Sequence, residues 1–207
     1  MPGGPWPGQH SSGIVSAEMS YLWGMNSTTA NDLSRQSMLP ACTPSVITTY
    51  LEMRSPAELR PKLCADERFW IDEATVKQWQ FNKFLYLTVG SPWAWNDKRG
   101  WADDQWRQYA ESDQLRTFGA YYDGSPAGYY EFHQDRDEVE IMYFGLLPAF
   151  VGRGLGGALL SRAIEDAWRM EPRRVWVHTC TLDHPAALAN YQARGMKIYK
   201  TETTQTS

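Results

Sequence analysis

The glycine-rich run from Val151 to Gly157 (VGRGLGG) contains the residues best suited by type and spacing to bind a ligand. Its four glycines, Gly152, Gly154, Gly156 and Gly157, lie between a predicted strand and a predicted helix. Glycines at such a point let backbone N–H groups converge on an anion, and the helix N-terminus adds a favourable dipole. A tight turn alone needs fewer glycines, so the run predicts a site for a phosphate-bearing ligand.

Two common phosphate-binding motifs do not fit this run. Gly152, Gly154 and Gly157 formally match the Gly-x-Gly-x-x-Gly pattern of dinucleotide-binding domains. That pattern opens its domain and is followed about 20 residues later by an acidic residue, whereas Val177 and His178 stand there in this chain. A Walker loop would continue with Lys and then Ser or Thr, which this run lacks. The phosphate ligand is therefore expected in a different fold.

A second group of reactive side chains, His178, Asp183 and His184, lies between a predicted strand and the last predicted helix. A neutral imidazole could act as a base or bind a substrate near neutral pH. Asp183 could equally cap the helix that is predicted to begin at Pro185, which would be a purely structural role. Cys180 lacks a second nearby thiolate, so no zinc site and no other metal is expected.

The elements that must position these residues follow from hydrophobic spacing and turn signals. A short helix is predicted after Ser55, and residues 140, 142, 144 and 146 are predicted to share one face of their strand. The tail from residue 201 onward is expected to be disordered. Strands are predicted over 45–53, 115–122, 127–133, 139–147, 174–180 and 196–201, and longer helices over 72–87, 103–111, 157–169 and 185–194. This order predicts an α+β or mixed-sheet domain over about residues 45–203.

The predicted strand over residues 140–147 and the glycine run after it resemble the acyl-CoA-binding motif of the GNAT superfamily of N-acetyltransferases. That motif reads Arg/Gln-x-x-Gly-x-Gly/Ala; Gly154 and Gly156 fill its glycine positions, while Val151 replaces Arg or Gln. The resemblance implies an α+β fold with a mixed, mostly antiparallel central sheet flanked by helices. It also implies acetyl-CoA as the cosubstrate.

The segment from His184 to Met196 resembles the second signature of the same family, Asn-x-x-Ala-x-x-x-Tyr-x-x-x-Gly-Phe. His184 stands in place of the Asn and Met196 in place of the Phe. Arg153 is expected to add positive charge beside the phosphates. By this resemblance, the acyl-CoA-binding residues are Leu146, Leu147, Val151, Gly152, Arg153, Gly154, Leu155, Gly156, Gly157, His184 and Asn190.

The resemblance also assigns two catalytic side chains. Glu140 lies at the start of the strand before the glycine run, where several family members carry a catalytic glutamate, and is predicted to accept a proton from the amine, directly or through water. A solvated strand-end carboxylate is the alternative. Tyr191 matches the family tyrosine that protonates the departing thiolate, with a packing role as the alternative. Whether Glu140 or a histidine, His178 or His184, is the base stays open.

Trp93, Trp95 and Trp101 lie where the family usually builds its acceptor site, and aromatic walls suit an apolar or cationic amine. Asp97 could pair with an ammonium group, and His178 is predicted to contact the substrate. A hydrophobic minicore under a long loop is the rival interpretation of the tryptophans. The predicted reaction is transfer of an acetyl group from acetyl-CoA to a primary amine of a small molecule. The alternatives are acylation of a peptide or protein amine, and a CoA-binding regulatory module without turnover.

Composition limits the other function classes. The chain has 207 residues and a formal net charge of -4, which argues against nucleic acid or anionic lipid as a partner. The chain has no apolar run of membrane-spanning length. Its three cysteines fit no disulfide framework, so a cytoplasmic location is expected. Residues 1–44, rich in Pro, Gly, Ser and Thr, are expected to be disordered. The family resemblance also implies a possible homodimer.

Overall fold

The computed structural model describes residues 45–205. The strands are β1 (Ser45–Met53), β2 (Phe69–Glu73), β3 (Leu115–Tyr122), β4 (Ser125–Asp135), β5 (Glu138–Leu146), β6 (Arg174–Cys180) and β7 (Lys197–Gln205). The helices are α1 (Trp79–Gly90), α2 (Asp103–Ala110), α3 (Gly156–Trp168) and α4 (Ala187–Ala193), with 3₁₀ turns η1 (Pro56–Glu58) and η2 (Pro148–Phe150). The strands predicted over 45–53, 115–122 and 174–180 are confirmed at both ends.

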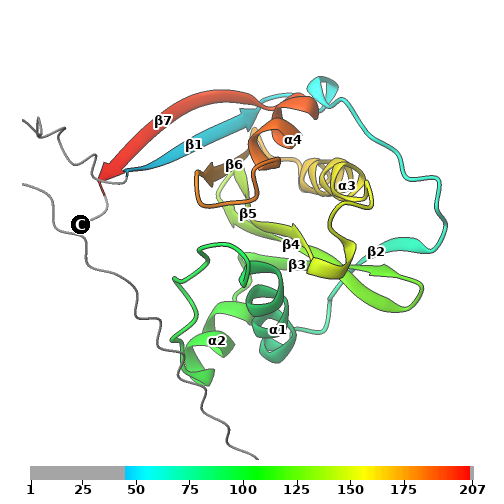
Figure 1. Cartoon of the computed structure of the whole chain (residues 1–207), viewed down its shortest axis with the longest axis vertical. Helices are drawn as coiled ribbons and strands as arrows, with labels where there is room; N and C mark the ends of the chain where they lie inside the picture. The colour runs from blue at the N-terminus through cyan, green and yellow to red at the C-terminus, as the bar shows by residue number, and fades with distance from the viewer. Residues whose placement is uncertain (1–44, 206–207) are drawn as a thin grey trace, which may run out of the picture. The chain divides into compact units, whose positions relative to one another are not determined.

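The strands form one sheet in the order β2-β3-β4-β5-β6-β1-β7 (Figure 1). Neighbouring strands are antiparallel throughout, except for β5 and β6, which are parallel. The centre is the predicted meander of β3, β4 and β5. Its first turn places Asp123 and Gly124 at positive φ, as a tight hairpin of two central residues requires. The predicted α+β class with a mixed, mostly antiparallel sheet is confirmed.

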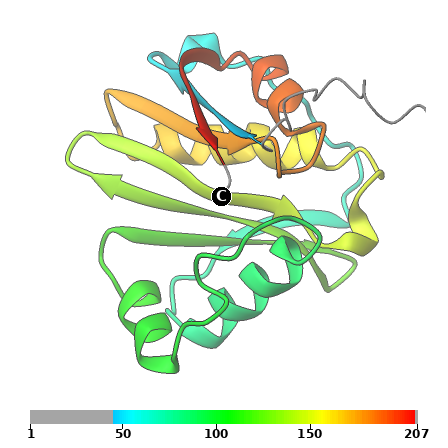
Figure 2. The ribbon, with the colours of Figure 1, turned by 60° about the vertical axis from the view of Figure 1, so that its left-hand side comes forward.

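Helices cover both faces of the sheet (Figures 1 and 2). On one face, Leu159 and Ile164 of α3 join a large buried cluster that includes Tyr130 of β4. On the other face, Leu85 of α1 packs against Tyr129 of the same strand. Both tyrosines are fully buried, because adjacent residues of a strand point to opposite faces and each face here has its own helical cover.

A β-bulge interrupts the pairing of β4 with β5. Glu131 lies opposite Tyr143 and Phe132 lies opposite Ile141, so Met142 has no partner across the ladder. A bulge of one residue reverses which face the following side chains occupy. The predicted common face of residues 140, 142, 144 and 146 is therefore wrong. Ile141 and Phe144 share the α3 face, whereas Tyr143 packs on the α1 face.

The helix predicted over residues 72–87 is wrong in its first half. Residues 69–73 form strand β2, in which Trp70 lies opposite Tyr121 of β3 and stacks on it at 4.3 Å between ring centroids. Helix α1 begins only at Trp79. Val76 contributed to the helical period, but it is 72% exposed and lies before the helix. The cross-strand pair of Trp70 and Tyr121 stabilises strand β2, and this contact outweighs the helical spacing of apolar residues in the local sequence.

Two smaller differences concern Ser55 and the C-terminal tail. Ser55 caps only the single turn η1, because Leu59 returns to extended backbone. The tail expected to be disordered from residue 201 instead continues β7 to Gln205, paired with β1. The prediction for residues 1–44 lies outside the described residues.

Candidate active site

Strands β5 and β6 begin side by side and then separate. Their pairing covers only Glu138–Glu140 opposite Arg174–Trp176. Beyond that point both strands line a cavity of about 1050 Å³, while β5 stays paired with β4 as far as Leu146. The edge of β5 that faces β6 therefore has no strand partner from Ile141 onward, and its backbone N–H and C=O groups are open to a ligand.

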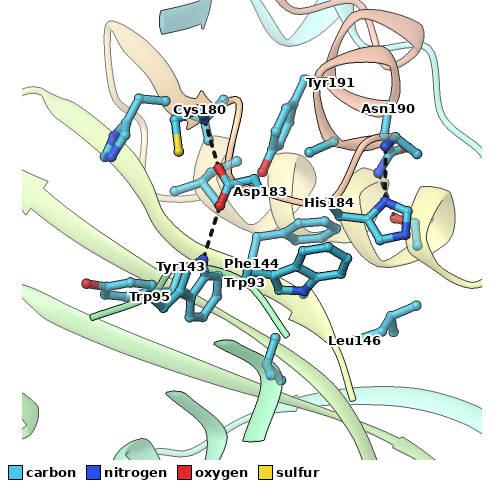
Figure 3. A pocket seen from close by; sticks show the side chains of 18 of the residues that line it. Trp93, Trp95, Tyr143, Phe144, Leu146, Cys180, Asp183, His184, Asn190 and Tyr191 are labelled. Carbon is cyan, nitrogen blue, oxygen red and sulfur yellow. Dashed lines mark hydrogen bonds between the residues drawn. The ribbon is translucent and has the colours of Figure 1, made fainter. Parts of the chain in front are cut away.

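The cavity has two chemically different ends. Figure 3 shows Leu146, His184 and Asn190 on one side and Trp95 and Tyr143 on the other. The first is called the glycine end and also includes Gly152, Gly154, Gly156, Gly157, Val151 and Lys62. The second is called the aromatic end and comprises Trp93, Trp95, Asp97, Lys98 and Tyr143.

At the glycine end the predicted glycines form the turn between β5 and α3. Gly152 and Gly154 adopt φ values of 82° and 78°, a left-handed conformation that other residues rarely take. Helix α3 then starts at Gly156 without a side-chain cap. The first N–H groups of a helix have no intrahelical partner, so those of α3 remain available to an anion.

Two cations that the sequence analysis missed lie over this loop. A side chain at Gly157 would collide with Arg194, at the end of α4, and with Lys62, in the segment before β2. The Lys62 ammonium also lies near Gly154, 3.9 Å from the position a Cβ would take there. Arg153, predicted for this role, does not line the cavity, and its guanidinium lies 4.9 Å from the centre of the Phe150 ring.

Of the other residues assigned to acyl-CoA binding, four line the cavity and two do not. Leu146, Val151, His184 and Asn190 line the cavity, and the Asn190 amide donates to the Gly156 carbonyl at 3.3 Å. Leu147 and Leu155 do not line it: Leu147 packs with the α1 cluster and Leu155 is buried.

Glu140 and His178 form a pair inside the cavity. Glu140 Oε1 lies 3.1 Å from His178 Nδ1, and the two residues come from the ends of β5 and β6 where the strands separate. The hydrogen bond to Glu140 raises the pKa of His178 above its ordinary value of 6.5. The Glu140 side chain is 11% exposed and that of His178 is 46% exposed, so the carboxylate is the more desolvated partner.

Tyr191 of α4 also reaches the cavity. The residue is 5% exposed, and Figure 3 shows its hydroxyl pointing toward the middle of the pocket, near Asp183. Burial, followed by the negative charge of Asp183, raises the pKa of Tyr191 above its ordinary value. The hydroxyl is therefore protonated at neutral pH and can donate a proton.

Asp183 is a structural anchor of the pocket wall and does not cap α4, whose first residue is Ala187. Asp183 Oδ2 accepts hydrogen bonds from the Thr179 hydroxyl at 2.8 Å and the Cys180 N–H at 2.9 Å. Asp183 Oδ1 accepts from Trp95 Nε1 at 3.2 Å (Figure 3).

Burial raises the pKa of the Cys180 thiol, which disfavours the nucleophilic thiolate form.

The aromatic end combines the predicted residues with an unpredicted lysine. Trp93, Trp95 and Asp97 line the cavity, whereas Trp101 does not. Asp97 pairs with the ammonium of its own neighbour Lys98, at 2.7 Å. The sequence alone did not indicate that Lys98 is buried, because its burial depends on how three other elements pack around it. These elements are α1, α2 and β5, which contribute Tyr86, Tyr109 and Tyr143. Trp101 packs against Trp106, whereas the acceptor-binding role of Trp93 and Trp95 stays a prediction.

A comparison with known families decides the classification. Residues 74–196 match the family model described as the acetyltransferase (GNAT) family. The chain belongs to the GNAT family of acetyltransferases. The matched residues run from the end of β2 to the start of β7 and include the glycine run and Tyr191. GNAT proteins use acetyl-CoA as their cosubstrate, so the chain is classed with acyl-CoA-dependent acetyltransferases.

Solved structures with the same fold are similar to this GNAT chain at low identity. A GCN5-related N-acetyltransferase from Kribbella flavida is 16% identical, with a TM-score of 0.53 over 76% of this chain and 56% of that one. One from Sphaerobacter thermophilus is 16% identical, with a TM-score of 0.54 over 76% and 49%. An aminoglycoside acetyltransferase from an uncultured soil metagenomic sample is 12% identical, with a TM-score of 0.53 over 62% and 88%. The chain thus spans about half the length of the two GCN5-related proteins. No curated protein matches its sequence.

The glycine end fits the acyl-CoA that the family uses. Free N–H groups at the start of α3, with Lys62 beside them in the cavity wall, suit the negative charge of phosphates. The unpaired edge of β5 suits an arm that carries amide groups, and Leu146 and Phe144 suit its apolar parts. Within residues 45–205, His, Cys, Asp and Glu side chains form no group of three that could hold a metal ion. No helix in this part of the chain is long and apolar enough to cross a membrane.

Proposed function

We propose that this chain transfers an acetyl group from acetyl-CoA to the primary amine of a small molecule by direct attack. The proposal is supported by one arrangement: Glu140, paired with His178, and Tyr191 open into the same cavity as the glycine end. Acetyl-CoA, when bound, supplies the acetyl group as a thioester. Every further step is carried by side chains of this chain.

Glu140 prepares the amine for attack. An alkyl amine has a pKa of about 10.4, so it is protonated at neutral pH and must lose a proton first. Protonated His178 donates to Glu140 Oε1, which orients the carboxylate. Glu140 Oε2 then accepts the proton of the amine, directly or through one water molecule.

Tyr191 completes the transfer at the leaving group. Its hydroxyl points into the cavity, and its raised pKa keeps it protonated until a proton is needed. It donates that proton to the sulfur as the carbon–sulfur bond breaks, so CoA leaves as a thiol. Burial of both Glu140 and Tyr191 strengthens their interactions with the reacting atoms.

The test is the rate of CoA thiol release with acetyl-CoA and a panel of primary amines. Glu140→Gln removes the base and Tyr191→Phe removes the acid, so each is expected to lower kcat by roughly 100-fold or more. Glu138→Gln is the matched control for the first, since Glu138 lies two residues upstream on β5 and pairs with Arg174. Tyr121→Phe, on β3 and away from the cavity, is the control for the second.

The outcomes separate the proposal from its alternatives. Full turnover in Glu140→Gln or Tyr191→Phe removes that side chain from the mechanism. Release with peptide amines but with no small amine points to a peptide or protein acceptor. Binding of acetyl-CoA without release in the presence of any amine points to a regulatory module without turnover.

A further inference from the structure

Lys98, in the loop between α1 and α2, is buried although it carries a charge. Its side chain is 8% exposed, and long cationic side chains are almost never so buried without partners. Four aromatic rings surround its ammonium, with their centres 4.6 to 5.8 Å away. These rings belong to Tyr86, Trp101, Tyr109 and Tyr143 and are called the aromatic cage.

Asp97 completes this cage as its counter-ion. Asp97 Oδ2 accepts from the Lys98 ammonium at 2.7 Å and from the Tyr143 hydroxyl at 2.5 Å, and Oδ1 accepts from the Tyr86 hydroxyl at 2.7 Å. Burial alone would raise the pKa of Asp97, but these three hydrogen bonds outweigh it and lower the pKa. Both oxygens thus accept hydrogen bonds from within the chain, and Lys98 is the cation that Asp97 already holds.

The cage opens directly onto the aromatic end of the cavity. Asp97, Lys98 and Tyr143 all line that end beside Trp93 and Trp95. The ring centres of Trp95 and Tyr143 are 5.0 Å apart and their planes are inclined by 56°, so two angled aromatic walls adjoin a cation site that the chain itself fills. An aromatic cage with a carboxylate is the usual recognition site for an alkyl ammonium group.

We propose that Lys98 acts as a built-in cation that sets the acceptor specificity of this cavity. The acceptor class is a monoamine with a flat apolar or aromatic body, which packs on Trp93, Trp95 and Tyr143 and presents its one amine to Glu140. Diamines, polyamines and aminoglycosides are disfavoured, because a second ammonium would meet Lys98 in a partly desolvated site. This inference rests on the proposed acetyl transfer to a small amine.

The first arm of the experiment measures kcat/KM for 2-phenylethylamine and for 1,5-diaminopentane. The wild-type chain is expected to prefer the monoamine by at least about tenfold. Lys98→Ala vacates the cage and leaves Asp97 to bind the second ammonium, so the ratio is expected to fall at least about tenfold. Lys83→Ala is the matched control, since Lys83 also pairs with a carboxylate, that of Asp103, and lies 5.5 Å from the Trp79 ring, but outside the cavity.

The second arm measures binding without turnover. Propylammonium chloride is expected to raise the Tm of Lys98→Ala by filling the vacated cage, and to leave the wild-type chain and Lys83→Ala unchanged at the same ionic strength. Lys98→Met keeps the cage filled but uncharged. It is expected to fold, to discriminate less against the diamine, and to show no response to propylammonium.

Two results would overturn the inference: equal acceptance of both amines by the wild-type chain, or no effect of propylammonium on Lys98→Ala. If none of the amines is acetylated by any variant, the proposed transfer fails on its own. Stabilisation of Lys98→Ala by propylammonium would even then support the cage as an ammonium site occupied by Lys98.

Discussion

The glycine end and the aromatic end of the cavity offer a ligand different kinds of contact. At the glycine end, contacts come from backbone N–H groups in a loop held open by positive φ at Gly152 and Gly154. At the aromatic end, they come from the side chains of one loop and one strand, such as Trp95 and Tyr143. Backbone contacts depend on local glycine spacing, whereas side-chain contacts depend on how distant segments pack.

This difference has a functional consequence. A backbone anion site tolerates changes of side chain, and the replacement of Arg or Gln by Val151 leaves the loop geometry in place. The aromatic end can vary its substrate through single side chains such as Lys98 without altering the sheet. Changes at the two ends are therefore expected to affect different ligands. Variants of Gly154, Trp95 and Lys62 test that separation, and a fourth variant tests the Glu140–His178 pair between them.

The largest effect is expected for Gly154→Val. Valine at a φ of 78° strains the loop by about 1–3 kcal/mol and so weakens acetyl-CoA binding roughly 10- to 100-fold. Gly124→Val, at a φ of 81° in the β3–β4 turn with open space around it, imposes similar strain away from the cavity. Titration calorimetry should find weak binding only for Gly154→Val; equal affinities in the two variants would refute the role of the loop.

The next effect is expected for Trp95→Ala, which removes a wall of the aromatic end and its hydrogen bond to Asp183. The KM for the amine is expected to rise about tenfold, while the affinity for acetyl-CoA stays within about twofold. Trp95→Phe keeps a ring and should recover most of the loss. Steady-state kinetics with each substrate varied in turn provides the check, and a parallel loss of acetyl-CoA affinity would show that the two ends are not separable.

A smaller effect is expected for Lys62→Ala. Loss of an exposed cation near Gly154 and Gly157 should weaken acetyl-CoA binding about three- to fivefold at low salt. The difference from wild type should shrink as ionic strength rises, because salt screens an exposed charge. Lys200→Ala, which removes a surface lysine paired with Glu202, should have no effect on affinity. A salt-independent loss in Lys62→Ala would contradict a charge contribution.

The smallest effect concerns the pH dependence of stability at the Glu140–His178 pair. The folded-state pKa of His178 is raised above 6.5. The contribution of His178 to the free energy of unfolding is therefore fully present below pH 6.5 and is lost as the pH rises through the raised pKa. Because the side chain is 46% exposed, the contribution is at most about 0.5 kcal/mol after screening. Urea unfolding should show His178→Gln less stable than wild type near pH 6 and equal to it at about pH 9. A difference that grows with pH would contradict the pairing.

Much of the fold could be predicted because its signals are local. The ends of β3 and β6 follow from alternation and turn residues, and two glycines of the predicted loop, Gly152 and Gly154, take positive φ. Strand β2 was missed because it depends on pairing with β3, which a local helical period cannot reveal. The bulge at Met142 was missed for the same reason, since register is a property of two strands.

The residues of the candidate site also fall into two groups, those that sequence motifs could predict and those that only tertiary packing places. Glu140 and Tyr191 could be named from motif positions, and both line the cavity. Lys62 and Lys98 could not, because their positions depend on tertiary packing: the Lys62 N–H donates to Ser161 Oγ, and the Lys98 ammonium lies 4.6 Å from the centre of the Tyr143 ring. Arg153 lies within the glycine run that is expected to bind the phosphates, but its side chain packs on Phe150 instead. Proximity in sequence is a poor guide to which cation faces a ligand.

Direct transfer within one cavity is tested most directly by a quenched single-turnover reaction read by mass spectrometry. Wild-type chain, acetyl-CoA and 2-phenylethylamine are mixed, and product amide, free CoA and intact protein are measured together over time. The account predicts equal amounts of amide and CoA, no acetylated protein at any time, and almost no product with Glu140→Gln. An acetylated protein that forms before the amide, or acetate in place of the amide, would contradict it.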